Sequence, residues 1–173
     1  MNQKILIAFA TTHGSTEEIA TAVAGTLNEA GQPVDLLPAR AVRSLEEHRA
    51  VVLGAPIYIF HLHKDASRFL SRYQPALSRL PVAVFAGGPY GPGTEDEWRE
   101  VRRELDQDLA KFPWLHPVSI HLVGGRFDPH HLRFPWSLVP ALRQSATADL
   151  RDWEAIRAWA AALPDCFHAV PTH

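Results

Sequence analysis

Five short apolar runs, spaced along the chain, constrain its fold more than any other feature of the sequence. Each run is β-branched or continuously apolar and is bounded by turn residues, which is typical of strands. The runs are Lys4–Phe9, Val34–Leu37, Ala50–Ala55, Val82–Gly87 and Val118–Gly124. Three of them show no alternation of polar and apolar residues, so both faces of those strands must be covered. The pattern predicts a parallel sheet enclosed by helices.

Helical periods separate the predicted strands. Apolar residues recur at helical spacing in four stretches, Glu17–Ala30, Lys64–Leu80, Glu95–Phe112 and Leu150–Leu163. Ser15 and Glu18 have the spacing of a capping box, and Gly31 stands where a helix C-cap is expected. Pro75 predicts a kink or an early end in the second helix. Alternating strands and helices predict an α/β fold with a doubly wound sheet, formed by residues 1–173 as a single domain.

Length, charge and cysteine content exclude several classes of protein. A chain of 173 residues with 46% apolar residues can bury one sizeable core. With 17 basic and 19 acidic side chains, the formal charge of −2 lacks the cationic excess of a nucleic-acid binder. Cys166 is the single cysteine and cannot form an internal disulfide, which fits a reducing compartment. No apolar run is long enough to span a membrane, so we expect a soluble, cytoplasmic protein.

The turn between the first strand and the first helix has the features of an anion site. Its sequence, Thr11-Thr12-His13-Gly14-Ser15-Thr16, places free amides and the positive end of the helix dipole beside four hydroxyls. Gly14 allows close approach of the backbone. The chain contains neither a P-loop nor a G-x-G-x-x-G sequence after a strand. A polar turn with an ordinary capping box is the alternative interpretation.

Two further loops are expected at the same edge of the sheet. Ligands of doubly wound sheets bind beyond the carboxyl ends of the strands, where the strand order switches. The loop after the third strand, residues 56–63, is rich in aromatic residues, and the loop after the fourth, residues 88–94, is rich in Gly and Pro. Such a pair of loops can hold a flat ring between side chains and backbone amides.

Several motifs resemble one known family. The segment T-T-H-G-S-T-E-E-I-A resembles the FMN phosphate-binding loop of flavodoxins. The segment G-A-P-I-Y resembles the first flavin-ring loop of the flavodoxin-like protoporphyrinogen dehydrogenases, the quinone-linked enzymes of haem synthesis. Gly124-Gly125-Arg126 and residues 151–156 are also similar to that branch. The resemblance implies a flavodoxin-like, five-stranded parallel sheet of order 2-1-3-4-5 with helices on both faces.

The resemblance also implies a cofactor, a function and partners. The cofactor is FMN, and the function is that of an FMN-dependent oxidoreductase with a quinone acceptor, similar to protoporphyrinogen dehydrogenase. The alternative is a flavodoxin-type electron-transfer protein without its own substrate. The expected partner is a redox protein or a quinone- or porphyrin-type small molecule. The implied cofactor-binding residues are Thr11, Thr12, His13, Gly14, Ser15 and Thr16 at the phosphate, Pro56, Ile57 and Tyr58 at the ring, and Gly87 and Gly88 on its other side.

One departure from the flavodoxin pattern bears on electron transfer. Flavodoxins usually carry a Gly in the loop after the third strand, where a peptide flip stabilises the one-electron semiquinone. This chain has Ile59 and Phe60 there. A bulky residue disfavours the positive-φ conformations that a flipped peptide often needs, so we expect little neutral semiquinone.

The segment Arg126–Thr147 has no clean helical period and is largely apolar around Phe134 and Trp136. A loop of this length in a compact domain is usually functional or covers another surface. Four interpretations remain open: packing on the domain's own flank, cover for the flavin edge, a homodimer interface, and peripheral contact with a membrane.

The histidines suggest a metal site less strongly than their number implies. His61 and His63, and likewise His130 and His131, lack a third ligand at a recognisable spacing. No metal is predicted. Because histidine titrates near neutrality, His61 or His63 is a candidate proton donor beside the flavin.

Overall fold

A computed structural model describes residues 3–58, 61–88, 93–127, 138, 140 and 148–170. A parallel sheet of order β2-β1-β3-β5-β6 lies at its centre, and a short β4 pairs antiparallel with the end of β3. The strands are β1 (Lys4–Phe9), β2 (Val34–Pro38), β3 (His48–Tyr58), β4 (His61–Leu62), β5 (Val82–Gly87) and β6 (Ser119–Val123). Numbering the five parallel strands along the chain gives 2-1-3-4-5, which confirms the expected order.

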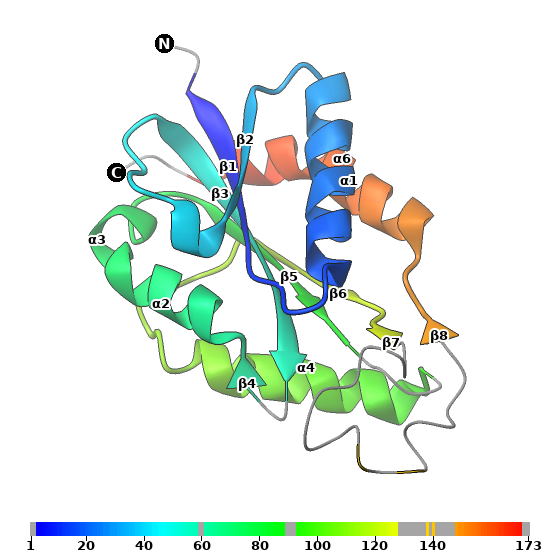
Figure 1. Ribbon diagram of the computed structural model, residues 1–173. Coiled ribbons are helices and arrows are strands. Elements are labelled where there is room, and N and C mark those ends of the chain that lie inside the picture. Colours follow the sequence, from blue (N-terminus) through cyan, green and yellow to red (C-terminus); the bar gives the residue numbers. More distant parts are fainter. Residues whose placement is uncertain are drawn as a thin grey trace.

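Helices cover both faces of this sheet. They are α1 (Ser15–Glu29), α2 (Lys64–Arg72), α3 (Gln74–Leu77), α4 (Glu95–Leu109) and α6 (Trp153–His168), with a short 3-10 helix η1 (Ala39–Ala41) after β2. α1 and α6 lie on one side of the sheet, and α2, α3 and α4 lie on the other (Figure 1). The architecture is the predicted three-layer α/β fold.

The central strands bury side chains toward both helical layers. In β1, Ile5 and Ile7 pack with the apolar residues of α1 and α6, whereas Leu6 and Ala8 pack with those of α2 and α4. All four are fully buried. This two-sided burial is why the strand sequences show no polar alternation.

The two ends of α1 compare differently with the sequence predictions. At its C-terminal end, Gly31 (φ +76°) follows the C-cap and donates to Asn28 O, and the next amide donates to Leu27 O, a Schellman motif. The predicted capping box at the other end is wrong. Gly14, in the left-handed region at φ +86°, is the N-cap, and no described side chain caps this terminus.

Two prolines also have different effects on the helices. The break predicted at Pro75 is confirmed, because α2 ends before it and α3 begins just before it. The last helix, in contrast, does not stop at Leu163 but continues through Pro164 to His168. Phe167 is buried on the same apolar stripe as Leu163, and its burial offsets the hydrogen bond that proline removes.

Of the segment predicted over residues 126–147, the structure describes residues 126, 127, 138 and 140. β7 (Arg126–Phe127) pairs antiparallel with β8 (Ala148–Asp149), so the two ends lie side by side. Predictions on Phe134, Trp136, His130 and His131 fall outside the described residues. In the described parts of the chain, no helix is long and apolar enough to cross a membrane.

Candidate cofactor site

A small pocket lies at the carboxyl end of the sheet, where β1 leads into α1. Four of its lining residues carry hydroxyls, and its described lining contains no Lys, Arg, Asp or Glu. The described lining residues are Thr11, Thr12, His13, Ser15, Thr16, Ile19, Pro56, Gly87, Gly124 and Gly125. The pocket has a volume of about 30 Å³, which accommodates a group of about the size of a water molecule or slightly larger.

The N-terminus of α1 offers unused backbone donors at this pocket. Glu18 N–H is the first amide that bonds within the helix, and it donates to Gly14 O at 3.1 Å. The amides of residues 15–17 therefore have no acceptor within the helix, and no described side chain caps them. Together with the helix dipole, these amides favour an anion.

Thr11 organises the turn before the helix. Its Oγ1 accepts a hydrogen bond from Gly14 N at 2.8 Å. The Thr11 hydroxyl proton is therefore free to be donated to another acceptor. Thr16 is buried at the start of the helix, with a relative exposure of 4%. The turn thus combines amides and hydroxyls as donors without adding a cation.

His63 connects a second loop to this turn. Its Nε2 lies 3.1 Å from Thr12 Oγ1, although 51 residues separate them in the sequence. His63 is also the N-cap of α2, where its Nδ1 accepts from Asp65 N at 3.1 Å. From the sequence, His63 was a candidate only for metal binding or for proton donation. The structure gives it contacts to the predicted phosphate loop.

The end of β3 forms the neighbouring side of the site. Pro56 pairs with Gly87 of β5 in the sheet register, and both line the pocket. Ile57 is buried in the core on the side of α2 and α4, so its side chain does not line the pocket. Tyr58 pairs with His61 in the β3–β4 hairpin. Gly88, at φ +146°, donates to Val123 O at 2.9 Å and lies outside the described lining.

Asp108 of α4 holds the β3–β4 hairpin in place. This carboxylate is buried and accepts hydrogen bonds from Leu62 N and from Lys111 Nζ. His61 Nδ1 lies 3.5 Å from it. Burial alone would raise the pKa of Asp108, but the hydrogen bonds from Lys111 and Leu62 outweigh it and hold that pKa below its ordinary value.

Three pocket residues were missing from the predicted set, namely Ile19 of α1 and the pair Gly124 and Gly125. Gly124 and Gly125 directly follow β6, the edge strand beside β5. They line the pocket together with the α1 turn, although they are far from that turn in the sequence. A Cβ atom on Gly124 would lie 2.0 Å from Leu150 O, so only glycine allows this close approach. The sequence did contain a signal for these two glycines. They form a Gly-Gly pair at the end of a predicted parallel strand, and the carboxyl ends of all parallel strands meet at this edge of the sheet.

Arg151 fixes the start of α1 to the start of α6. Its side chain is 5% exposed, pairs with Glu18 and with Asp149, and lies 4.7 Å above the Trp153 ring. The hydrogen bond to Asp149 is the largest of the effects that raise its pKa. Because two carboxylates neutralise this guanidinium, it adds little net charge to the pocket.

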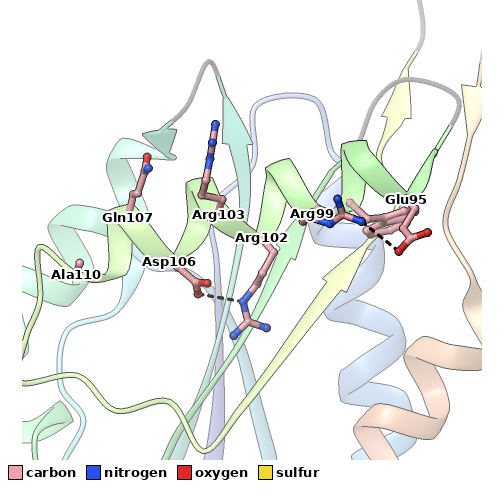
Figure 2. Close-up of a pocket in the computed structure, with 8 residues that line it drawn as sticks. Glu95, Arg99, Arg102, Arg103, Asp106, Gln107 and Ala110 are labelled. Atoms are coloured by element: carbon pink, nitrogen blue, oxygen red, sulfur yellow. Dashed lines mark hydrogen bonds and ion pairs between the residues drawn. The ribbon is translucent and has the colours of Figure 1, made fainter.

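Another hollow, of about 740 Å³, lies along the exposed face of α4 rather than at the strand ends. Figure 2 shows Arg99 directed toward Glu95 and Arg102 directed toward Asp106. Arg103 likewise pairs with a carboxylate of the same helix. The hollow is a shallow helix surface on which each of these arginines pairs with a carboxylate of the same helix.

Metal binding finds no support in the described residues. No three His, Cys, Asp or Glu side chains there are grouped so as to hold a metal ion. His63 and His61 instead contact Thr12 and Asp108, respectively.

Comparisons with known proteins agree with this geometry. A model of the flavodoxin domain matches residues 6–135. The chain is 32% identical over 163 residues to the protoporphyrinogen IX dehydrogenase (quinone) of Escherichia coli strain K12, covering 88% of this chain and 90% of that protein. The protein of the same name from Escherichia coli O157:H7 gives the same values.

Solved structures show the same fold. Oxidised flavodoxin 1 from Bacillus cereus matches with a TM-score of 0.58 at 17% identity, covering 97% of this chain and 99% of that one. Oxidised flavodoxin 2 from the same organism matches with a TM-score of 0.56 at 19% identity, covering 95% and 97%. Membership of the flavodoxin family implies FMN as the cofactor. The chain belongs to the flavodoxin domain family, in the branch that includes the Escherichia coli protoporphyrinogen IX dehydrogenases.

Proposed function

We propose that this protein is an FMN-dependent oxidoreductase that oxidises a porphyrinogen-type substrate and passes the electrons to a quinone. The observation that carries the proposal is the 32% identity to protoporphyrinogen IX dehydrogenase (quinone) over nearly the full length of both chains. The FMN phosphate would bind at the N-terminus of α1, and the ring would lie toward the loops after β3 and β5.

The donors in the pocket fit a phosphate group. The uncapped amides of residues 15–17 and the hydroxyls of Thr11 and Thr12 donate hydrogen bonds, and no described carboxylate lines the pocket to repel an anion. The pocket is too small for the flavin ring, so we assign only the phosphate end of the cofactor to it. The ring would be held outside it, near Pro56 and Gly87.

When bound, FMN supplies the redox chemistry. The chain's own residues bind and orient the cofactor. The α1 turn would hold the phosphate, and Pro56 and Gly87, which pair in the sheet and line the pocket, would lie on the side of the ring. Asp108 accepts the Leu62 N–H and so holds β4 beside the end of β3.

The alternative function is electron transfer without a substrate of the chain's own. The likeness to the Bacillus cereus flavodoxins lies below 20% identity and shows the fold alone. The higher identity to a dehydrogenase favours the enzymatic proposal. The replacement of the usual loop Gly by Ile59 and Phe60 also disfavours one-electron shuttling.

An anaerobic turnover assay separates the two functions. The FMN-reconstituted protein is mixed with protoporphyrinogen IX and a water-soluble quinone, and porphyrin fluorescence and quinone absorbance are followed together. We expect each porphyrin to form with the loss of three quinones, because the oxidation removes six electrons and each quinone accepts two. We expect the Gly14→Val protein to be inactive. Absence of porphyrin, together with a stable blue semiquinone on photoreduction, would support the carrier function instead.

A further inference from the structure

His63 makes two hydrogen bonds with its two ring nitrogens. Nδ1 accepts from the backbone N–H of Asp65, which caps α2. Nε2 lies 3.1 Å from the hydroxyl oxygen of Thr12 in the α1 turn. The same ring therefore joins the loop after β4 to the turn after β1.

The contact at Nδ1 determines the tautomer of the neutral ring. A nitrogen that accepts a hydrogen bond from an amide carries no proton, so the proton of the neutral imidazole resides on Nε2. Burial lowers the pKa of His63; Asp65 opposes this shift, and Lys64 adds to it. The neutral ring is thus the main form at pH 7, and Nε2–H donates to Thr12 Oγ1.

This donation determines what the Thr12 hydroxyl can do. Its oxygen accepts a hydrogen bond from His63 Nε2–H, so its own O–H is left to donate elsewhere. Thr12 is exposed and lines the pocket at the N-terminus of α1. A phosphate in this pocket accepts hydrogen bonds and donates none in its dianionic form, so it requires a hydroxyl aligned in this way.

We propose that His63 is a positioning residue for the FMN phosphate, holding Thr12 with its hydroxyl proton directed to the phosphate oxygens. This inference rests on the proposed binding of FMN at α1. It assigns to the loop after β4 a role in selecting phosphorylated over unphosphorylated flavin.

Two substitutions separate the two contacts of His63. Asn places its Oδ1 at the same number of bonds from the backbone as Nδ1, so His63→Asn keeps the helix cap and removes the contact to Thr12. Gln places its Nε2 at the same number of bonds as the imidazole Nε2, so His63→Gln keeps the contact and removes the cap. The dissociation constants of FMN and of riboflavin are measured by fluorescence titration of the apoprotein, and stability is measured by urea unfolding.

We expect His63→Asn to weaken FMN by about 3- to 10-fold, the range of one hydrogen bond, with riboflavin binding and the urea midpoint unchanged. We expect His63→Gln to lower the urea midpoint and to keep the wild-type ratio of FMN to riboflavin affinity. In a Thr12→Val background, His63→Asn should cause no further loss of FMN affinity, because the two residues act through one hydroxyl.

Two results would overturn the inference. One is an unchanged ratio of FMN to riboflavin affinity in His63→Asn, whether both affinities stay the same or fall equally. The other is full additivity of His63→Asn with Thr12→Val. The wild-type protein distinguishes this failure from that of the proposed site. If wild type prefers FMN to riboflavin and His63→Asn does so equally, only the role of His63 is wrong. If wild type shows no such preference, the phosphate site itself is wrong.

Discussion

Asp108→Ala tests how β4 is held beside the end of β3. In the native protein the Asp108 carboxylate accepts the buried N–H of Leu62 and the ammonium of Lys111. Alanine removes both acceptors and leaves the Leu62 amide buried without the only partner described for it. The substitution therefore acts on the β3–β4 hairpin rather than on the sheet itself.

The magnitude follows mainly from the Leu62 amide. A hydrogen bond to a charged acceptor contributes about 1.5–3 kcal/mol, and a buried donor left unpaired costs about 1–3 kcal/mol. Lys111 and His61 have side chains that are 58% and 71% exposed, so each adds at most a few tenths of a kcal/mol. We expect Asp108→Ala to lower the free energy of unfolding by about 2–4 kcal/mol, and Asp108→Asn, which keeps one acceptor oxygen, by about 1 kcal/mol.

Urea unfolding followed by circular dichroism measures both changes, from pH 7 down to about pH 3. The pKa of Asp108 is lowered in the folded state. The Asp108 carboxylate therefore contributes its full stabilisation above the pKa that it has in the unfolded chain. This contribution is lost as the pH falls through its lower pKa in the folded protein. The gap between wild type and Asp108→Asn should shrink below about pH 5. Asp106→Asn, on the exposed face of the same helix, is the control and should stay within about 0.5 kcal/mol of wild type. An Asp108→Ala protein as stable as this control, or a pH-independent gap, refutes the reasoning.

Three further predictions concern the backbone and the charge network of the site. Gly14→Val should abolish tight FMN binding and lower the free energy of unfolding by about 1–2 kcal/mol, because a residue with a side chain is disfavoured at φ +86° even where the space is open. Gly25→Ala, in the interior of α1, should instead raise the free energy of unfolding by about 0.5–1 kcal/mol. Urea unfolding measures both changes. Gly124→Ala should lower the free energy of unfolding by about 1–3 kcal/mol or more. Gly87→Ala, whose new Cβ would have its nearest neighbour at 3.8 Å, should fold normally and weaken only the binding of FMN. Equal stability of the two variants would contradict this. Arg151→Met should cost about 1.5–3 kcal/mol in thermal unfolding at low salt, and no loss would mean that its two ion pairs contribute nothing.

The sheet was predictable because its strands are buried on both faces. In β1, β3 and β5, buried apolar residues follow one another without a polar residue between them. In a run as short as a strand, this pattern is typical of the interior of a parallel sheet. The C-terminal end of α1 could also be predicted, because the residue after a helix often has a positive φ and Gly31 stands at that position. These features depend on local sequence and on burial alone.

The parts that the sequence did not reveal depend on backbone conformation and on distant contacts. Ser15 and Glu18 have capping-box spacing, but Gly14 takes the left-handed N-cap position and leaves the helix amides open. The last helix continues beyond Pro164 because Phe167, one turn later, is buried in the core. The contact between His63 and Thr12 crosses 51 residues and has no sequence pattern.

The central claim is that the FMN phosphate binds to the amides at the N-terminus of α1. The most direct test is a ¹H–¹⁵N correlation spectrum of the labelled apoprotein, titrated with FMN and separately with riboflavin. The account predicts large downfield shifts of the amide protons of residues 15–17 with FMN, and much smaller shifts with riboflavin. Quenching of flavin fluorescence by the protein, with these three amides unmoved by FMN, would contradict it.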